Sequence, residues 1–389
     1  MGLPKITFLI ATAGLGLLTA DIQKVPGLVI TGNTVAEKIA IGESKQIFSL
    51  EQAQEFGITQ TENPFAFKHV KAFYDYAGTN AELWIMLTSD ATKVSAMADK
   101  NGTIAKKLLN DAGGRIRVLG LIKEFEDDDN SANGLDADLD VAAVNLQALG
   151  EEFTTKYFPF RGVVSGNNFS GNVQNLKDYA TTEHNRVSVL LANTDGAKEA
   201  SIGLALGRLA STPVQRKLHR VKDGAVENFN AYFTNGEKVE SLSASWDALA
   251  DKNYIFMRNF VGRAGFYFSS DPTLTKETDD FKTLSNGFVM DKAMILAYNV
   301  LVENLADEVP VAEDGNIHPA IIKSWQSAVE SNINGNMTNQ GEISACKCFI
   351  DENQNVLQTG AMTVELQVLP VGYSEYITVK IGFTAQINA

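Results

Sequence analysis

The 389-residue chain has little of what marks several common protein classes. It contains two cysteines, Cys346 and Cys348, which lie too close together to build a disulfide framework, so we expect synthesis in the reducing cytoplasm. The four histidines are scattered and share no metal-ligand spacing with the cysteines. We therefore expect neither a disulfide-stapled domain nor a bound metal or cofactor.

Positive charge is also scarce. The chain has 33 lysines and arginines against 47 acidic residues, which gives a formal net charge of −14. Nucleic acid is therefore not an expected partner, because phosphate binding needs clustered cations. With 44% hydrophobic and 21% charged residues, the composition is that of a folded globular protein rather than a disordered one.

Long apolar runs are absent except near the start, where Lys5 is followed by ITFLIATAGLGLLTA. A signal peptide ending at Ala20 is one interpretation of this run. However, proline, threonine and glycine interrupt it, and it is too short to span a bilayer as a helix. We expect residues 1–24 to form an ordered arm, with no membrane insertion. The alternative, a secreted or surface α/β protein with residues 1–20 as a signal peptide, stays open.

Strand-like and helix-like segments alternate after the arm, which predicts an α/β fold with a doubly wound, largely parallel sheet. Ser49 and Gly57 supply the cap and stop signals of the first helix. The expected strands are 25–32, 37–43, 81–90, 114–125, 160–166 and 186–193. The expected helices are 49–57, 63–78, 140–157, 173–183 and 198–212.

The pattern changes near residue 284, where two long helix-like segments precede three strand-like runs. This order predicts a small C-terminal α+β domain, with helices at 286–309 and 319–333. The length of the chain also exceeds one ordinary core. The expected organisation is an arm at 1–24, one or more α/β domains at 25–283 with a possible sub-boundary near 95–113, an α+β domain at 284–374, and a strand arm at 375–389.

An acidic stretch, EFEDDDNSANGLDADLD, was compared with a calcium loop. Oxygen-bearing or turn residues fall at suitable spacing, but Asp136 replaces the usual hydrophobic residue and the last ligand is not glutamate. We favour a solvated loop here. The positions compared with the loop are Asp129, Ser131, Asn133, Gly134 and Asp140.

Motifs for catalysis are missing: the sequence has no nucleophile elbow, zinc helix or redox pair. The glycines of VVSGNNFSGN lack phosphate-loop spacing, and those of GLALG (203–207) favour close packing of their helix on the sheet over a ligand site. His69 and His318 are expected to be structural. We therefore expect that the protein is not an enzyme. A weaker alternative hypothesis is an α/β enzyme that uses the strand-end loop around Ser165 to Asn168.

Both ends of the chain are strand-like and have no neighbouring hairpin partner. EYITVKIGFTAQINA alternates apolar and polar residues up to Phe383, and LPKITFLIATAG is a second such run. Unpaired strands need a partner for their backbone groups, and an edge of another chain's sheet can provide one. Glycine and proline beside each run would allow a flexible connection.

Segments along most of the chain resemble one family, the contractile tail sheath proteins of bacteriophages and related contractile injection systems, especially the Bacteroidetes-type sheath-like family. The resemblance is carried by VPGLVITG with IGESKQIFSLEQAQEFGI, by ASIGLALGRLASTPVQRKLHRVKDGAV, and by NGFVMDKAMILAYNVLVENL, DGNIHPAIIKSWQSAVESNI, GEISACKCFIDENQNVL and VLPVGYSEYITVKIGFT.

This resemblance implies a structural subunit that polymerises in stacked hexameric rings around an inner tail tube protein and contracts to drive the tube through a target envelope. Baseplate and terminator proteins would be the partners at the two ends. The subunit would be made in the bacterial cytoplasm and assembled into a virion tail or injection particle.

The resemblance also implies roles for particular residues. Both termini would add strands to the C-terminal domains of neighbouring copies, and one C-terminal helix would face the tube. The implied arm residues are Lys5, Ile6, Thr7, Phe8, Leu9, Ile10, Tyr376, Ile377, Val379, Ile381 and Phe383. The tube-facing candidates are Lys323, Trp325 and Lys292.

Overall fold

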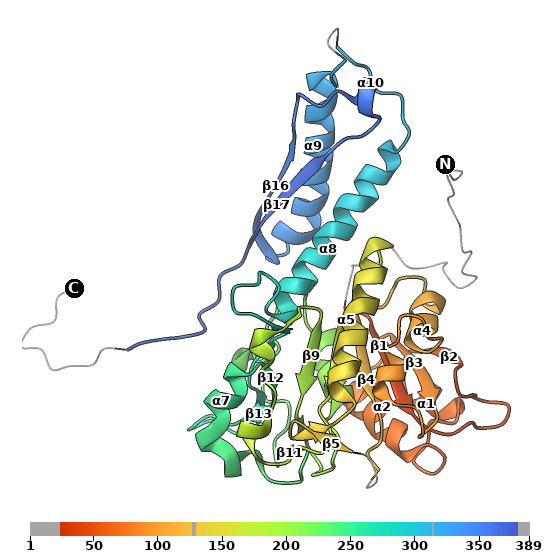
Figure 1. Cartoon of the computed structure of the whole chain (residues 1–389), viewed down its shortest axis with the longest axis vertical. Coiled ribbons are helices and arrows are strands. Elements are labelled where there is room, and N and C mark those ends of the chain that lie inside the picture. Colours follow the sequence, from red (N-terminus) through yellow and green to blue (C-terminus); the bar gives the residue numbers. More distant parts are fainter. Residues whose placement is uncertain (1–23, 127–129, 313–314, 380–389) are drawn as a thin grey trace, which may run out of the picture. The chain divides into compact units, whose positions relative to one another are not determined.

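The structure is a computed structural model and describes residues 24–126, 130–312 and 315–379. The chain divides into two compact units, one ending at Pro310 and the other beginning at Val311 (Figure 1). Each unit has its own secondary structure and is described separately.

The first unit is built on a seven-stranded sheet with the order β12-β9-β7-β4-β1-β3-β2. Six strands are parallel, and only the edge strand β2 is antiparallel to its neighbour. The predicted doubly wound, largely parallel sheet is therefore confirmed. The strands are β1 (Pro26–Thr31), β2 (Ser44–Ile47), β3 (Leu83–Thr88), β4 (Val118–Ile122), β7 (Arg161–Ser165), β9 (Val187–Leu190) and β12 (Tyr254–Ile255).

Helices cover both faces of this sheet. An added Cβ at Gly120 would meet Ile202 and Leu206 of one helix, whereas residues of the opposite pleat, such as Gly162, face Leu146 of another. The helices of the first unit are α1 (Leu50–Glu55), α2 (Pro64–Ala77), α3 (Val94–Met97), α4 (Ala105–Asp111), α5 (Leu139–Thr155), α6 (Ile202–Ala210), α7 (Trp246–Asp251) and α8 (Leu284–Leu301).

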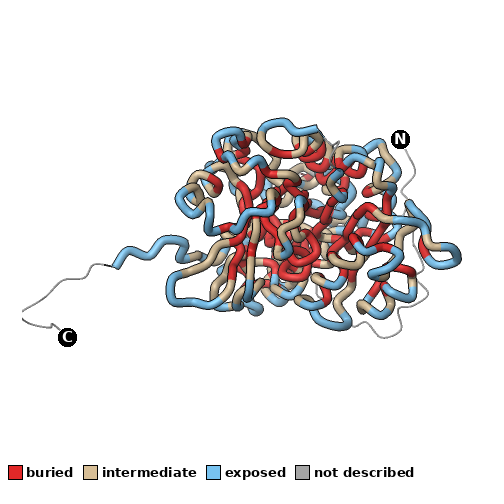
Figure 2. Tube along the Cα trace, turned by 90° about the horizontal axis from the view of Figure 1, so that it is seen from below, coloured by how far each residue is buried: buried red, intermediate tan, exposed pale blue. Residues whose placement is uncertain are grey.

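The core of the first unit lies along its central strands. Every residue of β1, β4 and β7 is buried, and the exposed residues gather in the loops (Figure 2). Burying one large aliphatic side chain contributes roughly 1.5–3 kcal/mol, so three such strands account for much of the driving force for folding. Short strand pairs decorate this body: β5 (Ser131–Ala132) with β6 (Leu135–Asp136), β8 (Glu183–His184) with β15 (Leu274–Thr275), β10 (Ala192–Asn193) with β11 (Tyr232–Phe233), and β13 (Met257–Arg258) with β14 (Tyr267–Phe268).

Helix α6 packs on helix α2 through its two glycines. A Cβ at Gly203 would collide with the carbonyl of His69, and one at Gly207 would lie 2.7 Å from the carbonyl oxygen of Phe73. The two glycines of GLALG therefore serve close packing, although the sequence predicted that packing against the sheet. The contact is mainly with a neighbouring helix, while Gly120 lets the same helix approach the sheet.

Two predicted elements of the first unit are wrong. Residues 37–43 form turns, with Glu37 and Gly42 at positive φ, and the strand begins only at Ser44. Residues 173–183 were predicted to be one helix but form two short 3₁₀ turns. The reason is local: the side chains of Asn172 and Asp178 accept hydrogen bonds from backbone amides two residues on, which favours turns over a continuous helix.

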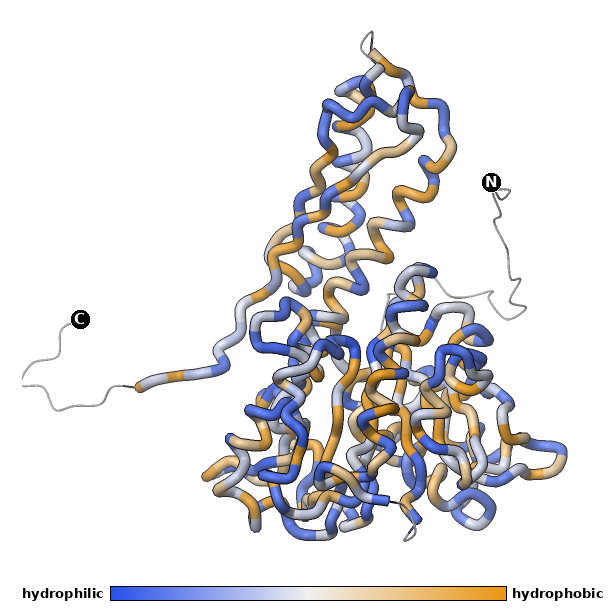
Figure 3. Tube along the Cα trace, in the orientation of Figure 1, coloured by the Kyte–Doolittle hydropathy of each residue, from blue (hydrophilic) through white to orange (hydrophobic). Residues whose placement is uncertain are grey.

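The second unit is small. Helix α9 (Pro319–Ile333) continues into a short π-helical turn (Asn334–Thr338), and strands β16 (Ile343–Ile350) and β17 (Val364–Pro370) form a two-stranded antiparallel sheet. A short helix, α10 (Val356–Thr359), lies between the strands in sequence. Hydrophobic and hydrophilic residues alternate along most of β17, as the colours of Figure 3 show.

Candidate functional site

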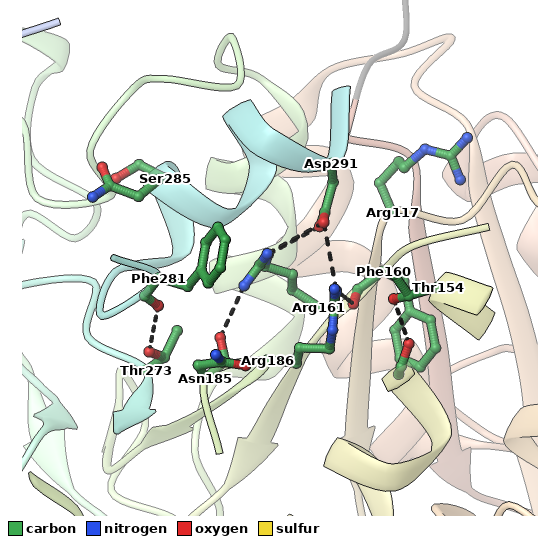
Figure 4. Close-up of polar contacts among 12 residues, drawn as sticks. Arg117, Thr154, Phe160, Arg161, Asn185, Arg186, Thr273, Phe281, Ser285 and Asp291 are labelled. Atoms are coloured by element: carbon green, nitrogen blue, oxygen red, sulfur yellow. Dashed lines mark hydrogen bonds and ion pairs between the residues drawn. The ribbon is translucent and has the colours of Figure 1, made fainter. Parts of the chain in front are cut away.

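A buried ionic cluster joins helix α8 to the sheet of the first unit (Figure 4). Asp291 accepts hydrogen bonds from Nε and Nη2 of Arg161, at 2.9 and 3.2 Å, and lies 3.4 Å from Nη1 of Arg186. Arg161 begins strand β7 and also donates to the carbonyl of Asn185 at 2.8 Å. One carboxylate on a helix is therefore held by two arginines from neighbouring strand segments.

The geometry around this cluster is tight. Gly287, one turn before Asp291, packs directly on the Arg161 guanidinium, and any Cβ there would overlap it. The ring of Phe281 lies 5.5 Å from the same guanidinium, at a distance suited to a cation–π contact. A glycine is needed at this position because the arginine must pass under the helix backbone.

Burial governs the electrostatics of this region. It lowers the pKa of Arg161, and the charge of Asp291 opposes that shift. It also lowers the pKa of the nearby Arg117 to about 10, again with Asp291 opposing. A buried pair of this kind fixes geometry more than it adds stability. We interpret the cluster as a mechanical anchor that makes helix α8 and the sheet move together.

The start of helix α8 is fixed as well. The Thr283 side chain accepts from the Asn286 amide, and the Asp271 carboxylate accepts from the Ser285 amide at 3.2 Å. Asp271 is itself buried and lies 3.4 Å from Nζ of Lys217. The first two turns of α8 are thus held at both the cap and the anchor.

Sequence reasoning did not identify this anchor. A signal was present, because Asp291 and Lys292 are the only charged residues between Leu284 and Val302. An isolated charge in a long apolar helix marks a buried pairing. The partners of Asp291 could not be identified from the sequence, because Arg161 lies 130 residues away from it.

In the strand-end loop around Ser165 to Asn168, which the enzyme hypothesis singled out, polar side chains form hydrogen bonds within the protein. The Ser165 hydroxyl donates to the side-chain oxygen of Asn167 and accepts from the Ala200 amide at 2.8 Å. Asn167 donates to the carbonyl of Lys123 at 2.9 Å. Both side chains are buried, and their hydrogen bonds close the ends of β7 and β4, which is a structural role.

The described residues of the stretch compared with a calcium loop form a hairpin and local hydrogen bonds. Asn133 and Gly134 both have positive φ and form the two-residue turn of the β5–β6 hairpin. Asp140 accepts from Asn133 at 2.9 Å and from the Tyr179 hydroxyl at 2.7 Å, and pairs with Lys177. Asp129 lies outside the described residues. Within residues 24–126, 130–312 and 315–379, no three His, Cys, Asp or Glu side chains are grouped to hold a metal ion.

Two histidines and both cysteines have structural roles. His69 is buried, and its Nδ1 accepts from the Gly203 amide at 3.3 Å, while His318 caps helix α9 through the Ala320 amide. Cys346 and Cys348 are reduced and buried on one face of β16. Burial raises the pKa of Cys346 to about 11, so its thiol is a poor nucleophile.

The second unit leaves sheet edges open. In the part of the chain that is described, β16 and β17 pair only with each other, so each has an outer edge without a strand partner. Helix α9 packs on one face through Ile322, Val329 and Ile333, and β16 turns Cys346, Cys348 and Ile350 inward. The other face exposes Phe349 and Leu369, at 53% and 60%.

The residues implied for the terminal arms lie mostly beyond the described ranges. Lys5, Ile6, Thr7, Phe8, Leu9, Ile10, Ile381 and Phe383 are outside them, as is the segment that the signal-peptide alternative concerns. Tyr376, Ile377 and Val379 are described, are strongly exposed, and belong to no strand. The strand-addition roles of these residues stay predictions.

The tube-facing candidates differ in their surroundings. Lys323 is exposed on α9, 3.2 Å from the Gln326 side chain and 3.7 Å from Glu352. Trp325 is half-buried on the same helix. Lys292 is only 3% exposed on helix α8, because it lies within the buried stretch that follows the anchor. Of the three, Lys292 is therefore the one that does not present its side chain at the surface.

Two family models cover the chain. The model described as DUF2586, N-terminal domain, matches residues 3–271, and the model described as DUF2586, C-terminal domain, matches residues 280–388. The chain belongs to the DUF2586 family. In this DUF2586 protein the gap between the models precedes α8, whereas the two compact units separate after Pro310.

Solved structures share the fold of the DUF2586 chain along nearly all its length. A chain of the anti-feeding prophage helical sheath in its contracted state is 15% identical, with a TM-score of 0.62, covering 99% of this chain and 100% of that chain. A chain of the PVC sheath complex, from an extracellular contractile injection system in its contracted state, is 14% identical, with a TM-score of 0.60 and coverage of 100% and 98%.

The sheath tail protein from Listeria innocua is more distant, at 9% identity and a TM-score of 0.51, covering 90% of this chain and 95% of that chain. A search with the sequence among curated proteins finds no significant match. The predicted fold, a doubly wound sheet followed by a small α+β part, is that of these sheath proteins. Among the described residues, no helix is long and apolar enough to cross a membrane.

Proposed function

We propose that this DUF2586 chain is a structural subunit of a contractile sheath that polymerises around an inner tube and shortens to drive the tube forward. The observation that carries the proposal is the fold match to chains of contracted sheaths over 99% and 100% of this chain. A match to the sheet alone would say little, because doubly wound folds serve many functions. Here the small second unit is part of the match.

Strand addition between copies is the second part of the proposal, and the second unit gives it physical support. A two-stranded sheet is at best marginally stable in water, and three or more strands are normally needed. Residues 5–10 of one neighbour and 376–383 of another would extend the β16–β17 sheet through main-chain hydrogen bonds. Their alternating side chains would set the register, since a slip of one residue exchanges the two faces.

The anchor in the first unit fits a subunit that must move without deforming. A sheath transmits force between copies, and a helix that slipped on its own sheet would dissipate that force. Asp291 with Arg161 and Arg186 resists such slippage, because breaking the cluster would leave charges buried without partners. Head-to-tail contacts between such rigid bodies give rings or helical tubes rather than closed dimers.

The remaining partners follow from the same proposal. Copies would form stacked hexameric rings, with baseplate and terminator proteins at the ends, after synthesis in the bacterial cytoplasm and before assembly into a virion tail or injection particle. The exposed face of α9, with Lys323 and the edge of Trp325, would contact the inner tail tube protein. No catalytic step is part of this function.

Deleting residues 1–14 tests the proposal. We expect the purified full chain to form tubes or rings by electron microscopy, and the truncated chain to stay soluble and unassembled with an unchanged far-ultraviolet circular dichroism spectrum per residue. Normal tubes from the truncated chain would refute strand addition by the N-terminal arm.

A point-variant pair separates side-chain register from simple loss of the arm. Phe8→Asp places a charge on the face that carries Ile6 and Ile10, whereas Thr7→Asp places it on the opposite face. We expect only Phe8→Asp to prevent assembly. Ile381→Asp and Thr378→Asp form the matching pair at the C-terminus. Equal effects of both members of a pair would contradict an alternating, half-buried strand.

A further inference from the structure

One end of the seven-stranded sheet carries a two-loop tip, which we define as residues 225–231 and 257–268. The loops are joined by main-chain hydrogen bonds from the Val226 amide to the Phe266 carbonyl, 2.8 Å, and from the Phe266 amide to the Glu227 carbonyl, 2.7 Å. Gly265 packs so closely that a Cβ there would lie 2.7 Å from the carbonyl oxygen of Glu227. The tip is therefore a built structure that directly follows the edge strand β12.

The tip displays apolar side chains in solvent. Phe229 is 84% exposed and Val261 is fully exposed. The Glu227 carboxylate accepts from the amides of Asn228 and Phe229, at 2.7 and 2.8 Å, which fixes the backbone that carries the exposed Phe229 ring. Apolar side chains held outward by a fixed loop mark an interaction surface more than scattered exposed residues do.

The tip is also basic within an acidic protein. Its two loops contain two arginines, Arg258 and Arg263, against one acidic residue, Glu227, although the whole chain has a net charge of −14. Arg258 stacks between the rings of Phe260 and Trp246, at 4.5 and 5.8 Å, and Arg263 lies exposed in the turn. The partner surface should therefore combine apolar and acidic residues.

Such a surface exists at the opposite end of the same sheet. The last strand there is β2, at the far end of the strand order from β12 (Figure 1). Ile41 and Phe48, at 45% and 39% exposure, flank this strand on its two sides in sequence. Glu51 and Glu55 of helix α1 follow directly and are exposed, and among the described residues neither forms an ion pair. We call these four residues the acidic edge.

We propose that the two-loop tip of one copy docks on the acidic edge of another copy, so that the first units join head to tail along the direction of their sheets. Opposite charges and exposed apolar groups at the two ends of one body favour this pairing over a symmetric one, in which like surfaces would meet. The contact rests on the proposed sheath function. It is separate from strand addition, because it uses side chains of the first unit only.

Charge reversal tests the contact in the full chain. Arg263→Glu should raise the protein concentration needed for tube formation about tenfold, and Glu51→Arg with Glu55→Arg should do the same, as one interfacial charge pair commonly changes binding by about that factor. The triple variant, with both ends reversed, should return to within about threefold of the parent. Lys100→Glu, an equal reversal at an exposed lysine that belongs to neither surface, is the control and should assemble like the parent.

Crosslinking gives an independent measurement. A mixture of Val261→Cys and Phe48→Cys chains should form a disulfide-linked dimer on oxidation, and either variant alone should not; the native cysteines are buried and give the background. Unchanged assembly of Arg263→Glu, or no rescue in the triple variant, overturns the contact while leaving the sheath proposal intact. If Arg263→Glu weakens only co-sedimentation with inner tube protein, the tip belongs to the tube and the contact is also overturned. A parent that never polymerises refutes the sheath function itself.

Discussion

The two units of this chain are stabilised in different ways. In the first, fully buried parallel strands are covered by helices on both faces, and even charged groups such as Asp291 and Arg161 are enclosed and paired. In the second, one helix covers one face of a two-stranded sheet whose other face is exposed. The first unit has the features of a complete domain, whereas the second has those of a domain that is finished by segments from elsewhere.

This difference predicts that substitutions in the first unit destabilise the protein more than substitutions in the second. The largest loss of stability should come from the anchor formed by Asp291 with Arg161 and Arg186. Asp291→Ala leaves two arginines without their buried partner and should reduce the free energy of unfolding by about 3–5 kcal/mol. Urea denaturation of unassembled protein measures this. Glu352→Ala, which removes an exposed pairing with Lys323 in the second unit, should cost at most about 1 kcal/mol. Equal losses from the two variants would break the comparison.

Glycine substitutions offer a second contrast. Gly203→Ala forces a Cβ into the carbonyl of His69 and should destabilise the chain by about 1–3 kcal/mol through overpacking. Gly335→Ala in the second unit meets no atom within 4 Å and should change stability by less than about 0.5 kcal/mol. Thermal denaturation of both variants checks the difference, and a destabilising Gly335→Ala would mean that the second unit is packed more tightly than described.

One pH-dependent contribution to stability lies in the first unit at His69. Burial lowers the pKa of His69 to about 3, below its ordinary value near 6.5, so the folded state keeps the imidazole neutral. The unfolded chain takes up the proton first, and stability therefore falls as pH decreases from about 6.5 toward 3, by about 1.4 kcal/mol per pH unit for this group. His69→Gln should flatten that slope. Parallel curves for the parent and the variant would exclude His69 as the cause.

Hydrogen exchange should give the smallest but most direct contrast. In unassembled protein, the amides of β16 and β17 should exchange faster than those of β1 and β4, because few contacts oppose local opening of a two-stranded sheet. On assembly, added strands should slow exchange in β16 and β17, with little change in β1. Equal protection before assembly would show that the second unit is already complete.

Local sequence signals explain which parts of the fold could be predicted. Ser49 and Gly57 marked the ends of helix α1 correctly, and the Ser49 side chain accepts from the Gln52 amide as a cap should. Alternating strands and helices gave the parallel sheet, since that pattern depends on short-range periodicity. The helix predicted at 173–183 was wrong because side-chain caps at Asn172 and Asp178 compete with helix formation. Hydrophobic periodicity alone does not reveal such competition.

Long-range pairings set the limit of sequence reasoning. The anchor joins residues 130 positions apart, and the two-loop tip needs loops that meet only in the folded chain. A lone charge in an apolar helix indicates that a partner exists, but the partner's identity depends on the order of strands in the sheet. Arg161 lies at the start of the strand predicted at 160–166, but its place beside Asp291 could be assigned only once that order was known.

The edges of the seven-stranded sheet affect which sheet an added strand can join. Under the strand addition that we propose, strands must be kept from joining the wrong sheet. Strand β12 has two residues, and β2 has four, of which Ser44, Lys45 and Gln46 are polar. Short, polar and charged edges discourage misplaced pairing. Strands β16 and β17 are longer, with eight and seven residues, and their edges are better suited to accept an added strand. The same chain can therefore resist aggregation at the large sheet and still accept ordered strand addition at the small one.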